Sequence, residues 1–285
     1  MNSPWLERRV VAFAHQGGAF EGPSSTLFAI ANAIEQGASA IELDVHATAD
    51  RRIVVSHDEM VDRTTNGRGE IAKYSLGELE ELDNAYWWVP GTDVAPNRAA
   101  HEYVHRGKAP GDRRFAVATL EEVVRAFPGV ALNLDIKRTD PEVEPYEQLL
   151  ADEVRRLECT GSVIVASFLD SALQHFRTLA PEVITSAATE ETASFYFRVQ
   201  AGEPVGPVPF AVLQVPATFG EFTVVDERFV ARAHDAGLAV HVWTVNEVDE
   251  MDRLLDLGVD GIISDTPTSL VELLRTRGCA WDGVL

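Results

Sequence analysis

The chain has 285 residues, of which 46% are hydrophobic and 24% charged, and its 45 acidic against 24 basic residues give a formal net charge of -21 at pH 7. The acidic balance argues against nucleic acid and against adsorption to anionic lipid as partners, because both select clustered Lys and Arg. The first residues, MNSPWLERRVVAFAH, lack the apolar core of a signal peptide, and no later run has the length of a membrane helix. We therefore expect a cytoplasmic protein without a stable membrane anchor; the oligomeric state stays unknown.

Eight apolar, β-rich runs are expected to be strands, and they lie at residues 10–14, 40–45, 131–137, 162–168, 183–188, 210–215, 239–245 and 261–265. Helical periods separate them, as in AIANAIEQGASAIELDV, where Gly37 closes a helix before a strand begins. This alternation is typical of parallel βαβ units, and eight units close a TIM (β/α)8 barrel. We predict an α/β fold with a single domain over residues 1–285. An open doubly wound sheet is the alternative, but its Gly-rich phosphate fingerprint is lacking.

The first strand runs directly into AHQGGAFEGPSST, residues 14–26. Its glycines and proline suit a turn, because they supply backbone angles that other residues avoid. A turn does not need His15. The histidine is therefore either incidental to the loop or one member of a catalytic pair.

One further strand breaks the alternation of strands and helices. Residues 52–58, RIVVSHD, follow the second strand too closely for a helix to lie between, so we expect an antiparallel hairpin. A two-residue turn at Asp50 and Arg51 would place His57 opposite Asp44. Residues 66 to about 116, with the aromatic stretch AYWWVPGTDVAPN, then form an insertion after the hairpin, and loops of this size are usually functional.

Acidic side chains mark the ends of two of these strands. Glu42 and Asp44 share one face because strand side chains alternate, and Asp135 and Lys137 share a face of the next strand. Buried carboxylates on one face need a positive group between them, and three oxygen ligands suit Mg²⁺, Ca²⁺ or Mn²⁺. Lys137 would then be free to hold an anion. The alternative is one exposed carboxylate and one paired with a lysine.

His15 and His57 are expected to reach the same barrel mouth as these carboxylates. A site with a divalent cation and a lysine suits a phosphate ester, and two imidazoles beside it suit a general acid and a general base. Trp243 should face this mouth and pack on an uncharged part of the substrate, unless it is a core residue. His46 is expected to be a solvated strand residue.

Together these segments resemble the glycerophosphodiester phosphodiesterase family, which has a TIM barrel of the PLC-like phosphodiesterase type. The matching segments are AHQGG, GASAIELDVHATAD, IVVSHDEMVDRTTNGRGEI, LNLDIK and VHVWTVN…LGVDGIISDTP. The resemblance implies that His15 and His57 are the acid–base pair, that Lys137 contacts the phosphate, and that Glu42, Asp44 and Asp135 bind one divalent cation. It further implies a small-molecule phosphodiester substrate, a role in lipid and glycerol metabolism, and an insertion that caps the mouth.

The sequence departs from the family pattern in three places. Gln16 replaces an arginine beside the substrate, Ser24 and Ser25 replace two other polar groups, and Asp135 is one methylene shorter than the usual glutamate. The expected activity is hydrolysis of glycerophosphodiesters to an alcohol and glycerol phosphate. Two alternatives stay open: a lysophospholipase D-like activity with the YWWVP segment as an apolar wall, and a barrel that binds metal and phosphodiester without turnover.

Overall fold

The computed structural model describes residues 10–137 and 146–281. Its strands are β1 (Val11–His15), β2 (Ala40–Ala47), β3 (Ile53–Val55), β4 (Ala131–Ile136), β5 (Val163–Ala166), β6 (Ile184–Thr185), β7 (Val212–Pro216), β8 (Thr218–Phe219), β9 (Phe222–Thr223), β10 (Ala239–Trp243) and β11 (Gly261–Ser264). Its α-helices are α1 (Leu27–Gln36), α2 (Leu76–Glu80), α3 (Leu120–Ala126), α4 (Tyr146–Arg156), α5 (Asp170–Leu179), α6 (Thr189–Ala201), α7 (Glu227–Asp235), α8 (Val248–Asp256) and α9 (Pro267–Thr276). In the described ranges, no helix has the length and apolar character needed to cross a membrane.

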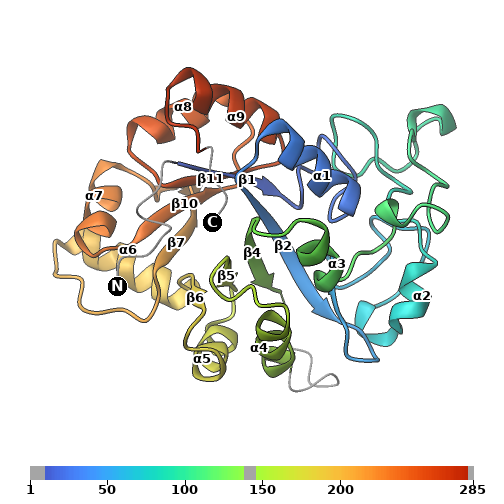
Figure 1. Cartoon of the computed structure of the whole chain (residues 1–285). Helices are drawn as coiled ribbons and strands as arrows, with labels where there is room; N and C mark the ends of the chain where they lie inside the picture. The colour runs from blue at the N-terminus through green and yellow to red at the C-terminus, as the bar shows by residue number, and fades with distance from the viewer. Residues whose placement is uncertain (1–9, 138–145, 282–285) are drawn as a thin grey trace.

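Eight of these strands form one parallel barrel surrounded by helices (Figure 1). The strand order is β6-β5-β4-β2-β1-β11-β10-β7, and a single parallel bridge between Ser186 and Val212 brings the two ends of the sheet together. All eight predicted barrel strands form. The predicted TIM-barrel fold is confirmed, and the open doubly wound alternative is wrong.

Helix ends follow local sequence signals. Thr26 caps α1 by accepting a hydrogen bond from the amide of Ala29, and Gly37 ends that helix in the left-handed region with a φ of 106°. At α3, Thr119 and Glu122 form a reciprocal capping box. These short signals fix where α1 and α3 begin and where α1 ends.

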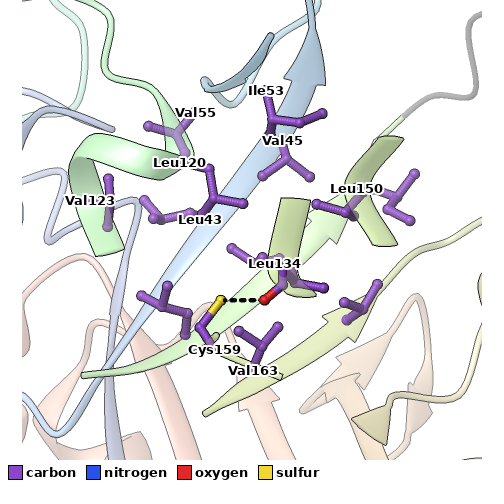
Figure 2. Packing of buried hydrophobic residues seen from close by; sticks show 14 of the residues in the cluster. Leu43, Val45, Ile53, Val55, Leu120, Val123, Leu134, Leu150, Cys159 and Val163 are labelled. Carbon is purple, nitrogen blue, oxygen red and sulfur yellow. Dashed lines mark hydrogen bonds between the residues drawn. The ribbon is translucent and has the colours of Figure 1, made fainter. Parts of the chain in front are cut away.

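The outer face of the barrel packs against the helices in a large apolar core (Figure 2). Leu43 and Val45 of β2 point into this core together with Leu134 of β4, while Leu120 comes from α3 and Leu150 from α4. Burying each such side chain contributes about 1.5–3 kcal/mol. Because side chains alternate along a strand, anchoring Leu43 and Val45 outward turns Glu42 and Asp44 toward the barrel interior.

The hairpin of β2 and β3 is antiparallel as expected, but its register is not the expected one. Val45 pairs with Val55 and Ala47 with Ile53, so Ser56, not His57, lies opposite Asp44. The loop has one residue more than the predicted two-residue turn, because Thr48 accepts a hydrogen bond from the Arg52 amide and Arg51 adopts a left-handed φ of 63°. His57 consequently lies just beyond the strand pairing.

The insertion contains α2 and three short 3-10 helices, η1 (Ile71–Lys73), η2 (Ala100–Glu102) and η3 (Arg113–Phe115). It packs against the loop between β1 and α1. The Trp88 indole donates to the carbonyl of Ala19 at 2.8 Å, and the Gly91 amide donates to the carbonyl of Phe20 at 2.9 Å. The insertion therefore supports the loop that follows His15.

Candidate active site

His15 is the last residue of β1, and its ring is fixed by a carboxylate from the other end of the chain. Its Nδ1 lies 2.6 Å from Oδ1 of Asp265, which directly follows β11, the barrel neighbour of β1. Asn246 holds Asp265 through two hydrogen bonds of 2.8 Å. Burial lowers the pKa of His15, but the hydrogen bond to Asp265 and the nearby carboxylate of Glu42 raise it more, to about 9.

His57 is fixed in a similar way. Its Nδ1 lies 2.6 Å from Oδ1 of Asp58, and the guanidinium of Arg63 donates from Nε to Oδ2 of Asp58 at 2.6 Å. Arg63 in turn pairs with Asp93 of the insertion. Burial raises the pKa of Asp58, but the bonds from His57 and Arg63 outweigh it and lower the pKa to about 2. The insertion thus contributes one end of a chain of charges that orients His57.

The two histidines lie beside each other at the barrel mouth. Their ring centroids are 6.2 Å apart, and the rings are nearly perpendicular, with an interplanar angle of 83°. Each ring has its Nδ1 occupied by a carboxylate, so Nε2 is the nitrogen left for proton transfer, and at His15 the side-chain amide of Gln16 lies 3.3 Å from it. The structure brings together the pair singled out from the sequence.

The three predicted carboxylates also converge. Ligand oxygens of Glu42, Asp44 and Asp135 all lie within 4.8 Å of one another. The strand registers explain this, since Glu42 lies beside His15 of β1, and Asp44 lies beside Asp135 of β4. Oδ2 of Asp44 and Oδ1 of Asp135 are buried and have no hydrogen-bond partner in the described part of the chain. Unpartnered carboxylate oxygens in a buried cluster fit a hard divalent cation.

Burial and mutual repulsion disfavour the charged forms of the carboxylates in this cluster. Burial raises the pKa of Asp44 to about 8, and repulsion from Glu42 adds to the increase, which Lys137 only partly offsets. Burial raises the pKa of Glu42 as well. A positive group close to Glu42 and Asp44 would favour their ionised forms.

Lys137 is not free to hold an anion as the structure stands. Its Nζ lies 2.9 Å from Oδ1 of Asp44 and 3.1 Å from Oδ2 of Asp135. Burial lowers the pKa of Lys137, but the two carboxylates raise it by more. The pKa is therefore above its ordinary value, and the ammonium stays charged. The physical reason is that the converging carboxylates attract the nearest cationic side chain. The sequence left open that one carboxylate pairs with a lysine instead of binding a cation, and such a pair is present within the cluster.

Gln16 lies in a tight loop beneath these groups. Its backbone amide donates to Oε2 of Glu42 at 3.2 Å, and its side-chain Nε2 lies 3.3 Å from Nε2 of His15. Gln16, Ser24 and Ser25 are all buried, and Gln16 has a left-handed φ of 53°. At Gly18, with a φ of 90°, an added Cβ would lie 2.9 Å from Cγ of Pro267. The glycine is thus needed for the loop to pass this close to α9.

A cavity of about 610 Å³ joins these residues to an apolar region on the other side of the mouth. Its polar end is lined by His15, Glu42, His57, Asp135 and Lys137. Its apolar end is lined by Phe168, Tyr196, Phe197, Phe219, Phe222 and Trp243. Trp243 is half-buried at the end of β10 and contacts Phe168 edge-on, with ring centroids 5.5 Å apart. Gln16 is not among the residues that line this cavity.

Two sequence expectations about this region are wrong. The YWWVP segment, residues 86–90, does not line the cavity; Trp88 stacks on His105, and Arg106 lies over the ring of Tyr86, because the insertion packs on itself and on the first loop. His46 is 6% exposed and not solvated. Burial lowers the pKa of His46 to about 4, with partial compensation from a hydrogen bond to the backbone of His57 in the returning hairpin.

Sequence reasoning missed the residues that orient the histidines. Asp265 and Asn246 fix His15, and Asp58, Arg63 and Asp93 fix His57. One sequence signal was available, because Asp265 ends the last predicted strand and a closed barrel places that strand beside the first. Asp93 carries no comparable signal, since it lies in irregular structure.

The mouth of this eight-stranded parallel barrel holds two oriented histidines, an acidic triad and a lysine. This combination defines a barrel hydrolase that acts on an anionic ester. The sequence profile of the Glycerophosphoryl diester phosphodiesterase family matches residues 15–269. The chain belongs to this family, as the sequence motifs predicted.

One relative is similar to this chain in sequence, and two solved structures are similar to it in fold. A glycerophosphodiester phosphodiesterase of Caldanaerobacter subterraneus subsp. tengcongensis is 29% identical over 95% of this chain and 100% of its own. The phosphodiesterase domain of a Mycobacterium tuberculosis protein, 20% identical, has a similar fold, with a TM-score of 0.77 over 94% of this chain and 99% of that one. An Oleispira antarctica phosphodiesterase, solved with the product sn-glycerol-3-phosphate, is 22% identical, with a TM-score of 0.69 over 95% of this chain and 99% of that one.

Proposed function

We propose that this protein hydrolyses glycerophosphodiesters to an alcohol and glycerol phosphate, with residues 1–285 acting as one domain that carries an insertion at about 66–116. The observation that carries the proposal is the pairing of His15 with His57 at 6.2 Å in the cavity that also holds the three carboxylates. The product bound by the Oleispira antarctica relative supports the same substrate class. A barrel that only binds would not need two oriented imidazoles.

Glu42, Asp44 and Asp135 would hold one divalent cation, either Mg²⁺, Ca²⁺ or Mn²⁺. Their oxygens are the hard ligands these ions prefer, and the unpartnered oxygens of Asp44 and Asp135 are available for binding. When bound, such a cation stabilises negative charge on the phosphoryl oxygens. It would also compete with Lys137 for Asp44 and Asp135, which would release the lysine ammonium toward the substrate phosphate.

In the proposed reaction, one histidine accepts a proton from water as the water oxygen bonds to phosphorus. The bond between phosphorus and the alcohol oxygen breaks, and the other histidine donates a proton to that oxygen. The products are an alcohol and glycerol phosphate. His15 and His57 share these two roles without a fixed order, while Lys137 contacts the phosphate and Trp243 packs on an uncharged part of the substrate. Gln16 does not line the cavity and acts through its contact with Nε2 of His15.

The test is a substrate panel. Protein stripped of metal by chelation and dialysis is incubated with several glycerophosphodiesters and with Mg²⁺, Ca²⁺ or Mn²⁺, and both released alcohol and glycerol phosphate are measured. We expect stoichiometric release that depends on one of the three ions. If calorimetry shows diesters binding to the metal-loaded protein and no alcohol is released from any of them, the protein is a binder and the proposed function is wrong.

Replacing Asp265 with asparagine should lower kcat by about 10- to 100-fold and change KM little, because part of the roughly 10²- to 10⁴-fold worth of acid–base catalysis depends on the orientation of His15. The measurement is steady-state kinetics on the best diester of the panel, accompanied by a thermal melt. If kcat falls as expected and the melting temperature is unchanged, the variant has lost the orientation of His15 and not its fold. A variant with wild-type kcat would show that Asp265 does not position His15.

Restoring the family arginine with Gln16→Arg should raise kcat/KM for small glycerophosphodiesters by about tenfold, because a guanidinium adds a charge-assisted contact that a neutral amide lacks. Gln16→Lys is the matched control, since it adds the charge without the planar fork. If the arginine variant keeps the wild-type melting temperature and kcat/KM does not rise on any diester, Gln16 belongs to a different scheme of substrate recognition.

A further inference from the structure

His241 of β10 is a buried histidine that takes no part in the proposed reaction. It is 0% exposed, and its ring packs against that of Phe13 in β1, with ring centroids 4.8 Å apart. Gly261 of β11 makes room for the imidazole, because an added Cβ there would lie 2.8 Å from Cδ2 of His241. The barrel interior therefore accommodates this ring only because its neighbour on β11 lacks a side chain.

Packing alone does not explain this histidine. Burial lowers the pKa of His241 to about 3, so the ring is neutral. Its Nε2 is buried and has no hydrogen-bond partner in the described part of the chain, and a leucine would avoid the cost of that unpaired nitrogen. The other ring nitrogen, Nδ1, lies 3.5 Å from Nε2 of Gln214, the register partner of His241 on β7. The polar side of the imidazole therefore serves the side chain of Gln214.

The side chain of Gln214 reaches across the barrel interior. Its Nε2 donates to Oδ1 of Asn133 at 2.8 Å, although β7 and β4 are not neighbours in the sheet. Asn133 is the register partner of Glu42, and it shares one face of β4 with Asp135 because side chains alternate. The amide of Gln214 is thus held between His241 and Asn133, beside the carboxylate cluster.

These contacts leave two hydrogen-bonding groups for a ligand. Gln214 and Asn133 both line the cavity. Oε1 of Gln214 and Nδ2 of Asn133 have no partner within residues 10–137 and 146–281, and neither atom is sealed from solvent. One of them accepts a hydrogen bond and the other donates, and a hydroxyl group can do both. Because the pair is neutral, it suits a hydroxyl better than it suits the phosphate itself.

We infer that Gln214 and Asn133 form a subsite for a hydroxyl group of the substrate, and that His241 is a positioning residue behind Gln214. Gln214 is then the specificity-determining residue of the subsite. The inference rests on the proposed function and narrows its substrates to diesters that carry a hydroxyl close to the phosphate. A pocket built to pair with a hydroxyl rejects an analogue without one, because its own polar groups lose water and gain no partner.

The experiment compares glycerophosphocholine with 3-hydroxypropyl, 2-hydroxypropyl and propyl phosphocholine, which share the choline leaving group and lack one or both hydroxyls. Choline release gives kcat and KM, and thermal melts monitor folding. The variants are Gln214→Leu, His241→Leu and His241→Asn, and Gln200→Leu at an exposed position of α6 is the matched control. Asparagine keeps an acceptor near the position of Nδ1, whereas leucine removes it.

For the wild type we expect kcat/KM to be about tenfold or more higher for glycerophosphocholine than for propyl phosphocholine. Gln214→Leu should lose about tenfold on glycerophosphocholine and stay within about twofold on the propyl compound, while Gln200→Leu keeps wild-type values. His241→Leu should show the same selective loss with little change in melting temperature, and His241→Asn should recover most of the preference. A histidine that only supports the fold would lower the melting temperature and affect both substrates equally.

The inference fails alone if glycerophosphocholine is hydrolysed and removal of both hydroxyls changes nothing, or if Gln214→Leu loses equally on every diester or keeps the full preference. Wild-type preference in His241→Leu would overturn its positioning role. If no diester releases choline, the proposed function fails, and calorimetry in saturating Mg²⁺, Ca²⁺ or Mn²⁺ tests the subsite. Glycerol 3-phosphate should then bind about tenfold more tightly than propyl phosphate to the wild type and not to Gln214→Leu. Equal affinities of the wild type for the two would overturn the subsite as well.

Discussion

Replacing His15 or His57 with alanine is expected to lower kcat on the best glycerophosphodiester by about 10²- to 10⁴-fold, the usual contribution of general acid–base catalysis, while KM changes little. The physical reason is that each imidazole presents Nε2 to the same cavity while its Nδ1 is fixed by Asp265 or Asp58. Steady-state kinetics on purified variants with the activating ion measures the effect.

His234→Ala is a suitable control, because His234 pairs with Asp260 at 2.9 Å and does not line the cavity. The double variant His15→Ala/His57→Ala should be little worse than the poorer single variant, since residues that act in one step are not additive. Turnover close to that of the wild type in either single variant would remove that histidine from the mechanism.

Asp44→Asn is expected to abolish metal-dependent turnover, with a fall of about 10³-fold or more, because metal-ion stabilisation of a phosphoryl group is worth several kcal/mol. Asp44 is fully buried and central to the triad, and the amide keeps its size while removing the charge. The second readout is independent of activity. A ligand that binds only the folded state raises the free energy of unfolding by about 2.7 kcal/mol at 100 times its Kd.

Thermal melts in chelator and in saturating Mg²⁺, Ca²⁺ or Mn²⁺ should therefore show an increase in Tm for the wild type and none for Asp44→Asn. Asp249→Asn, at an exposed position of α8, is the matched control and should respond to the ion as the wild type does. A variant that keeps both the metal-induced increase in Tm and the turnover would show that the triad does not hold the ion.

Much of the fold and of the site could be predicted from the sequence, because both depend on short-range repetition. The alternation of helical and strand periods indicated eight βα units, and the barrel has eight parallel strands. The two-residue period of a strand put Glu42 and Asp44 on the face opposite Leu43 and Val45, and burial of the latter pair in the outer core fixes that orientation. The position of His15 at the end of a strand likewise predicted its place at the mouth.

Other features depend on contacts between residues far apart in the chain, and only the tertiary structure decided them. Asp265 orients His15 across 250 positions, which required the barrel to close β11 against β1. Lys137 lies against Asp44 because neighbouring strands place three carboxylates around it, and a pattern of charges cannot show which partner is nearer.

The apolar end of the cavity illustrates the same difference. Composition drew attention to the aromatic insertion, but its rings are used to pack the insertion against the first loop, and the cavity takes its rings from α6 and the β8–β9 hairpin. The sequence by itself determined which faces of the strands carry chemistry, because alternation is a local property of the backbone. Which loops surround that chemistry was decided by packing across the whole barrel, because contact between distant segments depends on the closed fold.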